Sequence, residues 1–422
     1  AKDAARAEDC YRVEIMKKLF AVGSDFVLDI VVTFPDLVNF KKFATRYKGP
    51  FSKQVKVGYK TILARRGDEV AIDGKEIEAR KLVEQAAAFG ADVRISLGGN
   101  GAQGATTLAA LGCKVFFIGG YSTEQLSELP HRDLRLFKKV DLSFARVSES
   151  YKSLSVILQA PGTNRYILND GRGRRIRRLA PYIQKLPDTM QEITNEYGEL
   201  DALILVGFHG LFATGISDHD YRLVKSVIDK ARNTTSSLLF TDAGSLVAFT
   251  AKQRRLLFKI YSLFDVLSVN EDELAQICQS IGVSAKDKLR AMSKLLKSSE
   301  RLSTIWLHTP DYQASVSVKY GVEPLEKAQT FAAAAGVYRV EKGSYPTIRQ
   351  LNSMAKSKDY SKTGKKLVND ALRKYGDKID DARLAVTPCY RAKGFVSSVG
   401  AGDTATAAYA FSLVSYAQKS QK

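Results

Sequence analysis

Short apolar runs alternate along the chain with longer stretches in which apolar residues recur at helical spacing. The runs are rich in Val, Ile, Leu and Phe and contain few polar positions, which is typical of strands buried on both faces of a sheet. Strands that alternate with helices predict an α/β protein with a doubly wound, mostly parallel sheet and helices on both faces. We expect strands at 26–32, 92–97, 113–118, 153–158, 165–168, 201–208, 236–242, 266–269, 304–309 and 314–318, and helices between them, for example at 76–88, 221–232 and 254–264.

The start of the chain differs from this pattern. Residues 1–22 are charged at first and then place apolar side chains at roughly helical spacing. We therefore expect residues 1–23 to form an N-terminal helical extension and residues 24–422 to form the main domain. The segment 347–384 is also charged and is expected to be helical in two pieces.

A glycine-rich turn near the C-terminus carries the strongest chemical signal. A β-prone run reaches Gly-Ala-Gly-Asp at 400–403, and a helical stretch follows from Thr404. Glycines at such a turn let backbone N–H groups point into one small space, where the helix dipole also favours an anion. Asp403 would repel that anion, unless its task is to take a proton from a nucleophile that attacks it, as in phosphoryl transfer. The alternative is an ordinary turn with Asp403 as helix N-cap.

A second glycine turn, Gly98-Gly99-Asn100, follows the strand at 92–97 and precedes a helix of small residues. It either lets a polar ligand approach the backbone or allows helix and strand to pack closely. Asp29 lies inside the apolar run 26–32. A carboxylate there is either a hydrogen-bonded part of the core or a contact to substrate.

Other polar side chains stand where strands end, namely Asp242, Asn270 and Glu273. Ligands bind beyond the carboxyl ends of strands in doubly wound sheets, so we expect these groups to converge with Asp403. Asn270 and Glu273 are three residues apart at a helix start, where they would hold a hydrated Mg²⁺ beside a polyphosphate. The alternative is a capping box, in which each side chain bonds the other residue's backbone N–H.

The formal net charge of the chain is +19, with 64 Lys and Arg. This favours anionic partners: phosphorylated metabolites, nucleotides or nucleic acid. The basic run 172–178 would grip phosphate or RNA, or it is a solvated loop. No apolar run is long enough to cross a bilayer, and we expect no membrane partner. The four cysteines show no disulfide or metal spacing, which favours the cytoplasm, or an organelle interior if the N-terminus is a processed one.

The two glycine turns, the strand residues Asn164-Arg165-Tyr166-Ile167 and the Asn270–Glu273 segment occur in one order along the chain. In this the chain resembles the ribokinase-like (PfkB) sugar kinases, and most closely the ADP-dependent glucokinase and phosphofructokinase branch. The resemblance covers roughly residues 24–418 and includes a long helical insert before Val386-Thr387-Pro388. Four blocks carry it in the right order: Gly98-Gly99-Asn100, Asn164-Arg165-Tyr166-Ile167, the N-x-x-E block Asn270-Glu271-Asp272-Glu273, and the G-x-G-D block Gly400-Ala401-Gly402-Asp403.

The resemblance implies a large ribokinase-like domain and a smaller β-rich lid, built from discontinuous segments at roughly 36–95 and 114–185, that closes on the sugar. It also implies roles for single residues. Asp403 would be the general base, and Gly400, Ala401 and Gly402 would hold the transferring phosphoryl group. Asn270 and Val399 would contact the nucleotide together with these glycines, and Glu273 and Asp242 would organise Mg²⁺. The residues expected to face the sugar are Asp29, Gly98, Gly99, Asn100, Asn164 and Arg165.

Two positions depart from the pattern of that branch. Where that branch has an H-x-E motif, this chain has Phe240 in place of the His and Asp242 in place of the Glu. Where that branch has an N-x-D motif, this chain has Val27-Leu28-Asp29, which keeps only the Asp. The leading interpretation is a glycolytic sugar kinase that transfers a phosphoryl group from ADP, or from ATP, to a hydroxyl of a sugar or sugar phosphate with the help of Mg²⁺. The alternative is a catalytically inactive kinase-like subunit that is structural or binds RNA in a ribonucleoprotein assembly.

Overall fold

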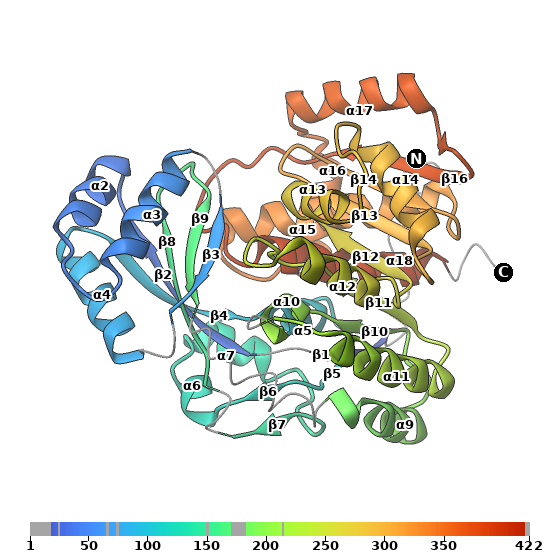
Figure 1. The fold of residues 1–422 in the computed structure, drawn as a ribbon, viewed down its shortest axis with the longest axis horizontal. Helices are drawn as coiled ribbons and strands as arrows, with labels where there is room; N and C mark the ends of the chain where they lie inside the picture. The colour runs from blue at the N-terminus through green and yellow to red at the C-terminus, as the bar shows by residue number, and fades with distance from the viewer. Residues whose placement is uncertain are drawn as a thin grey trace.

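The computed structural model describes residues 18–23, 26–64, 67–72, 76–148, 152–169, 183–212 and 215–417. A large α/β body and a smaller body stand side by side, the smaller one at the left in Figure 1. The basic run 172–178 and residues 1–17 lie outside the described residues.

The large body is built on a nine-stranded sheet with the order β15-β16-β14-β13-β12-β11-β10-β1-β5. The strands from β13 to β5 in this order run parallel, and β14, β16 and β15 continue the sheet by antiparallel pairing. The expected doubly wound, mostly parallel sheet is therefore confirmed. Its strands are β1 (Leu19–Gly23), β5 (Lys114–Phe117), β10 (Ala202–Leu205), β11 (Leu238–Asp242), β12 (Val266–Val269), β13 (Thr304–His308), β14 (Tyr312–Ser317), β15 (Lys378–Ile379) and β16 (Ala382–Pro388).

Helices cover both faces of this sheet, and alternate residues of each strand enter two separate cores. In β10, Ala202 and Ile204 join the core under α5, α15 and α18, while Leu203 and Leu205 join the core under α9, α11 and α12. This explains why the strands read as continuous apolar runs. The helices of this body are α5 (Asn100–Ala110), α9 (Leu186–Tyr197), α10 (Phe208–Leu211), α11 (Asp218–Thr234), α12 (Ala251–Tyr261), α13 (Glu271–Ser280), α14 (Lys288–Ser298), α15 (Val322–Lys342), α16 (Ile348–Ser357), α17 (Lys362–Tyr375) and α18 (Ala401–Ala417).

The prediction of an N-terminal helical extension is wrong for residues 18–23, the part of it that the structure describes. Leu19–Gly23 is not helical but forms β1, which pairs in parallel with β10 on one side and β5 on the other. All five residues are buried, so the strand lies in the interior of the sheet. A helix-like spacing over so short a segment is outweighed by pairing on both edges.

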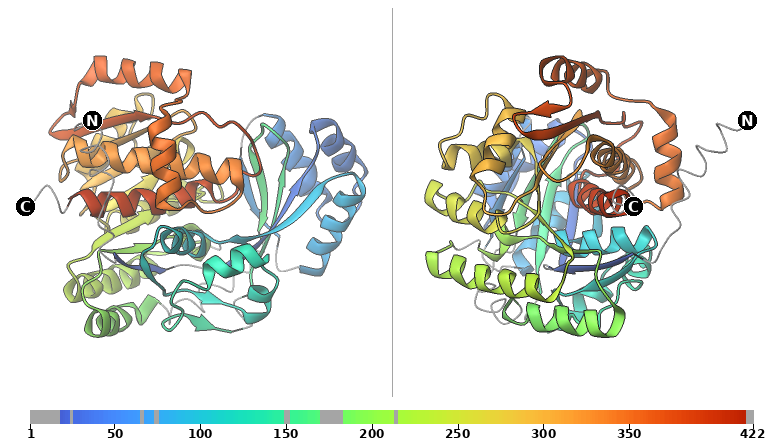
Figure 2. Two further views of the ribbon diagram at one scale, coloured as in Figure 1. Left: turned by 180° about the vertical axis from the view of Figure 1, so that it is seen from behind. Right: turned by 90° about the vertical axis from the view of Figure 1, so that its right-hand side faces the viewer.

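The smaller body contains a five-stranded sheet with the order β3-β9-β8-β2-β4. Its helices α2, α3 and α4 lie on the side that faces away from the large body (Figures 1 and 2). The expected lid segments need correction, because β2 begins before residue 36 and β5 belongs to the nine-stranded sheet. The elements are β2 (Val27–Thr33), β3 (Asp68–Ala71), β4 (Asp92–Gly98), β8 (Leu154–Gln159), β9 (Arg165–Asn169), α2 (Leu37–Arg46), α3 (Ser52–Leu63) and α4 (Glu76–Ala88).

A small connection between the two bodies lies at the bottom of the view in Figure 1. It holds the two-stranded sheet β6-β7 and two short helices. Among the helices that the structure describes, none combines the length and the apolar character that a bilayer-spanning segment needs. The elements of this connection are β6 (Gly120–Tyr121), α6 (Thr123–Ser127), α7 (His131–Phe137) and β7 (Arg146–Val147).

Candidate active site

The C-terminal glycine turn is the centre of the candidate site. Gly400 has φ +73°, a conformation that favours glycine, and α18 begins at the next residue. A Cβ atom on Gly400 would lie 1.5 Å from Oε1 of Gln103, which belongs to the first turn of α5. The helix that follows the Gly98-Gly99-Asn100 turn therefore packs directly against the turn at 400–403, so the structure brings the two glycine turns together.

Two arginines from different parts of the fold donate to backbone carbonyls just before Gly400. Nη1 of Arg165, at the start of β9, donates to the carbonyl O of Ser398 at 2.9 Å. Nε of Arg339, in α15, donates to the carbonyl O of Val399 at 3.2 Å. Arg339 is only 2% exposed. These bonds fix the direction of the backbone where it enters the turn, and they place two cations beside it.

Arg339 also connects the turn to the smaller body. Its Nη1 donates to the carbonyl O of Gly343 at 2.9 Å, and its Nη2 donates to Oγ of Ser96 at 3.3 Å. Ser96 in β4 is the register partner of Asp29 in β2. A single buried guanidinium therefore links α15, the glycine turn and the small sheet.

Asp403 lies in the first turn of α18 and is partly buried. Burial, and next the Asp242 carboxylate, raise the pKa of Asp403 to about 6, while the charges of Arg165, His209 and Arg339 act in the opposite direction. A carboxylate with a pKa near 6 is ionised at neutral pH and is still basic enough to accept a proton. Because α18 begins at Ala401, Asp403 is the third residue of the helix, and the expectation of Asp403 as N-cap is wrong.

Asp29 is a second buried acid and is 5% exposed. Its carboxyl group lies over Gly98, where an added Cβ would come within 2.2 Å of the carboxyl carbon. Burial, followed by the charge of Asp403, raises the pKa of Asp29 to about 8, although Arg165 and Arg339 lower it. The small sheet therefore presents a carboxyl group close enough to interact with the base candidate in α18.

Asp242 ends β11 and faces the same region. Its Oδ1 accepts a hydrogen bond from the Gly244 N–H at 3.1 Å, and its Oδ2 accepts one from Oγ1 of Thr406 at 3.4 Å. Nε2 of His308, at the end of β13, lies 4.0 Å from Oδ2 of Asp242. The desolvation of the buried imidazole lowers the pKa of His308, so this ring is neutral at pH 7.

Asn270 and Glu273 form the capping box that the sequence left open. Oδ1 of Asn270 accepts from the Glu273 N–H at 2.9 Å, and Oε2 of Glu273 accepts from the Asn270 N–H at 2.9 Å. Glu273 is 7% exposed, and burial, with Asp242 and Asp403 nearby, raises its pKa well above the ordinary value. A residue needed only for capping would gain nothing from lying among other carboxylates.

Asp242 and Glu273 are also the residues expected to bind a metal ion. In the part of the chain that the structure describes, no group of three or more His, Cys, Asp or Glu side chains is arranged to hold one. Mg²⁺, however, is commonly bound through one or two carboxylates together with waters and substrate phosphates. Burial, and next the charge of Asp242, raise the Glu273 pKa, and a divalent cation would relieve the repulsion between the two carboxylates. The donor set therefore fits a magnesium–nucleotide site.

Not every expected residue joins this group. Asn164 is exposed, its Oδ1 accepts from the Arg165 N–H at 2.9 Å, and its side chain lies against Gly67. Gly99 has φ +83° and acts as the N-cap of α5, with Asn100 as the first helical residue. Among the described residues, no hydrogen bond joins Asn100 or Asn164 to Asp403, so the contact of this turn and of Asn164 with substrate stays a prediction.

Sequence reasoning missed three residues of the site: His209, His308 and Arg339. The ring of His209 lies over Gly244, and its charge lowers the pKa of Asp403. Both histidines stand at or just after the carboxyl end of a parallel strand, β10 or β13, and this position could have identified them. Nothing in its local sequence marks Arg339, because its partner Val399 lies 60 residues away.

Comparison with known folds agrees with this architecture. A phosphofructokinase from Pyrococcus horikoshii OT3, solved with AMP, is 14% identical, with 95% of this chain and 98% of that chain covered and a TM-score of 0.66. An ADP-dependent kinase in complex with fructose-6-phosphate and ADPbetaS is 16% identical, with 97% of each chain covered and a TM-score of 0.72. The last common ancestor of ADP-dependent phosphofructokinases from Methanosarcinales is 16% identical, with 97% of this chain and 98% of that chain covered and a TM-score of 0.68. At these identities the likeness shows a shared fold.

The fold is that of the ribokinase-like class. The model of the ADP-specific phosphofructokinase/glucokinase conserved region matches residues 62–412, and the chain belongs to this family. It is therefore an ADP-dependent sugar kinase. A comparison with curated protein sequences finds no match.

Proposed function

We propose that the protein transfers the β-phosphoryl group of ADP to a hydroxyl of a sugar phosphate, with Asp403 as the general base. The observation that carries this proposal is the position of Asp403: partly buried, directly after the Gly400 turn, and near the charges of Arg165 and Arg339. The Ala401 N–H donates to the carbonyl O of Ser398 at 3.3 Å. Among the described residues, the N–H groups of Gly400 and Gly402 have no backbone partner, and they would be available for the phosphoryl oxygens. The turn would thus supply both an anion site and a base within one helical turn.

The chemistry then proceeds in one displacement. The sugar hydroxyl gives its proton to Asp403, and its oxygen forms a bond to the β-phosphorus. The bond from that phosphorus to the bridging oxygen breaks, and AMP leaves with the electron pair. Charge that develops on the phosphoryl oxygens would be stabilised by the amides of Gly400 and Gly402 and by Arg165. The expected part of the Ala401 amide is not supported, because its N–H already donates to Ser398. Asn270 and Val399 would contact the nucleotide beside them.

Glu273 and Asp242 would hold Mg²⁺ at this site. A bound Mg²⁺ would neutralise charge on the nucleotide phosphates. Phe240, at the position of the family's histidine, is fully buried and packs against Tyr409, with ring centroids 6.1 Å apart. The carboxylate of Asp242 remains available without that histidine, so the substitution leaves the acidic pair intact.

Asp29 would contact the sugar from the small sheet, which would act as the lid. Its pKa of about 8 makes it a hydrogen-bond donor as well as an acceptor at neutral pH. The turn at Gly98, Gly99 and Asn100, and the exposed Asn164, would line the same side. A sugar phosphate is favoured over a neutral sugar because the chain is strongly basic, and a relative of the same fold is solved with fructose-6-phosphate.

A donor and acceptor panel tests this function. ADP or ATP, with Mg²⁺, is incubated with fructose 6-phosphate, glucose or a nucleoside, and AMP or ADP formation is measured. We expect AMP from ADP, with fructose 6-phosphate as the preferred acceptor. A thermal-shift series with ADP, AMP and ATP runs beside it, because a ligand that binds the folded state raises its stability. No turnover with any pair, and no shift with any nucleotide, would favour the inactive structural or RNA-binding subunit.

A further inference from the structure

The smaller body carries a basic surface that the catalytic proposal does not use. Between Asp36 and Asp68 the sequence contains nine Lys and Arg residues and no Asp or Glu. Seven of the nine lie in the described part of α2, α3 and their connection, and all seven are exposed. We call this set the basic face: Lys41, Lys42, Arg46, Lys48, Lys53, Lys56 and Lys60.

The cations form stripes opposite the buried side of each helix. In α3 the buried positions are Val55, Gly58 and Ile62, and an added Cβ on Gly58 would lie 2.5 Å from the Tyr166 ring of β9. The exposed positions Lys53, Lys56 and Lys60 are spaced by three and four residues and so follow one side of the helix.

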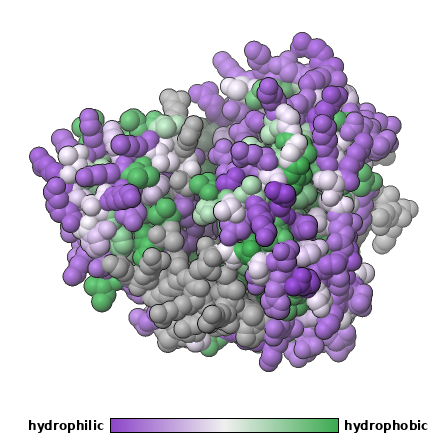
Figure 3. Space-filling view, in the orientation of Figure 1, coloured by the Kyte–Doolittle hydropathy of each residue, from purple (hydrophilic) through white to green (hydrophobic). Residues whose placement is uncertain are grey.

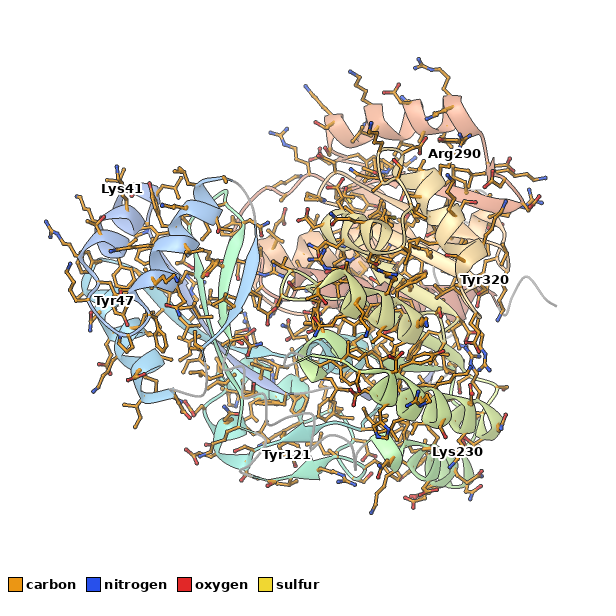
Figure 4. The ribbon with its side chains drawn as sticks, in the orientation of Figure 1. Lys41, Tyr47, Tyr121, Lys230, Arg290 and Tyr320 are labelled. Carbon is orange, nitrogen blue, oxygen red and sulfur yellow. The ribbon has the colours of Figure 1, made fainter. Side chains whose placement is uncertain are left out.

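α2 shows the same arrangement beside α3. Phe40 and Phe43 are buried, and the Phe40 ring meets the Tyr59 ring of α3 edge-on at 5.6 Å. Lys41 extends away from the ribbon in Figure 4. The two stripes therefore share the outer surface of the smaller body.

None of these seven cations forms an ion pair with a carboxylate among the described residues, whereas cations elsewhere do. Lys225, for example, pairs with both Asp229 and Glu300. A surface that concentrates unpaired charge of one sign attracts a polyanion. The face lies on the side of the small sheet away from the large body, so its partner need not compete with substrate (Figures 1 and 2).

Exposed aliphatic side chains accompany the charges. Among the described residues, ten large hydrophobic side chains are exposed, and three of them, Val38, Val57 and Leu63, belong to α2 and α3. These helices have only 10 and 12 residues. Their aromatic residues are largely turned inward, with Phe40, Phe43 and Phe51 buried, so the two helices offer no exposed ring on which a base would stack. Figure 3 shows hydrophobic side chains scattered among hydrophilic ones on this body.

We propose that the basic face docks on the surface of an anionic lipid bilayer. Lysines next to a membrane are attracted by acidic headgroups, and aliphatic tips on the same surface enter the interface. This binding would be peripheral. It differs from the absence of a membrane partner expected from composition, which considered only spanning segments. The inference is independent of the kinase reaction.

Co-sedimentation with vesicles tests the proposal on the full chain. We expect binding to vesicles of phosphatidylcholine with phosphatidylserine, weak binding to phosphatidylcholine alone, and release by added salt. The triple variant Lys53→Glu, Lys56→Glu, Lys60→Glu should bind at least about 100-fold more weakly, since each lysine near the surface contributes about a fivefold factor. The variant Val57→Ser with Leu63→Ser should bind several-fold more weakly at unchanged net charge.

The matched control changes the same amount of charge elsewhere. Lys356, Lys362 and Lys366 are exposed in or near α16 and α17, and the variant Lys356→Glu, Lys362→Glu, Lys366→Glu should keep most of the binding. Three results would overturn the proposal: equal loss in the control variant, no binding to either vesicle, or binding to an RNA homopolymer that is lost in the α3 variant while vesicle binding is absent. ADP-dependent turnover of both triple variants should remain near that of the unchanged protein.

Discussion

Nη1 of Arg165 donates a hydrogen bond to the carbonyl O of Ser398 at 2.9 Å. Arg165 belongs to the small sheet, and Ser398 lies two residues before Gly400 in the large body. The contact therefore couples the position of the small sheet to the shape of the Gly400 turn. It also places a cation whose charge acts on Asp29, Asp403 and His308 alike.

Replacing Arg165 tests this coupling. Arg165→Ala removes both the bond and the charge, and we expect kcat/KM for ADP to fall by about 100-fold or more. Arg165→Lys keeps the charge without the planar fork and should recover only part of the loss. Steady-state kinetics with ADP as the varied substrate measures both. If Arg165→Ala changed only thermal stability and left kcat/KM unchanged, the arginine would be structural.

Gly400→Ala should disable the turn. The added Cβ would lie 1.5 Å from Oε1 of Gln103, and φ +73° costs alanine about 1 kcal/mol in addition. We expect large losses of turnover and a lower Tm. Gly394→Ala is the matched control, because no atom lies within 4 Å of its added Cβ. Adding Gln103→Ala to Gly400→Ala should restore part of the Tm, since it removes the clash and leaves the backbone strain; an unchanged Tm would argue against the observed packing.

Replacing Asp29 should change both the free energy of unfolding and KM for the sugar. Its raised pKa means that the folded state keeps a proton that the unfolded state loses, so its contribution is present below about pH 4 and is lost as pH rises toward 8. Asp29→Asn should therefore raise the free energy of unfolding at pH 7, by up to about 4 kcal/mol. It should also raise KM for the sugar, because a contact is altered. Chemical denaturation at several pH values measures the first effect, and destabilisation by Asp29→Asn at pH 7 would contradict it.

Asp287 gives the opposite dependence on pH, far from the site. Burial alone would raise its pKa, but hydrogen bonds from Lys374 and Tyr375 and from the Arg290 N–H lower it to about 2. Stability from this group is present above about pH 4 and is lost as pH falls toward 2. Because Asp287 is only half-buried and its partner Lys374 is 61% exposed, solvent screens the pair, and Asp287→Asn should cost only about 1 kcal/mol near pH 6. The difference from the unchanged protein should vanish near pH 2, and a constant difference at all pH values would exclude this linkage.

Much of the fold was predictable from local pattern. Strands such as β11 and β13 are buried on both faces, so their apolar runs stand out, and Gly400 is the residue type that its backbone conformation favours. The strand β1 was not predictable, because only pairing with β5 and β10 makes Leu19–Gly23 extended. Short segments of this kind take their structure from tertiary neighbours.

The site was predictable in part for the same reason. Asp242 ends β11 and Glu273 follows β12, and these are neighbouring parallel strands, so their approach was predictable. The β-prone run expected before Gly400 forms no strand, and Asp403 is instead brought to these acids by α18, whose Thr406 donates to Asp242. Arg339 could not be found, since its role depends on contacts with Val399 and Ser96 that no local spacing reveals. The capping box of Asn270 and Glu273 shows that two interpretations weighed as alternatives describe one structure: the cap holds Glu273 in place among the other acids.

The acid limb of the pH–rate profile follows from Asp403. Since its pKa is about 6 and the base must be ionised, log kcat/KM should fall with unit slope below about pH 6. The fall should be present with ADP saturating and the sugar varied. A profile flat from about pH 5 to pH 8 would mean that the rate does not depend on this carboxylate.

Turnover of Asp403→Asn with ADP and Mg²⁺ tests the central claim most directly. The substitution keeps the size of the side chain and removes the proton acceptor, so kcat should fall by at least about 1,000-fold while ADP still raises the Tm. Asp381→Asn, at a side chain that is 93% exposed, serves as the control and should turn over normally. Turnover of Asp403→Asn within a few fold of the unchanged protein would contradict the account.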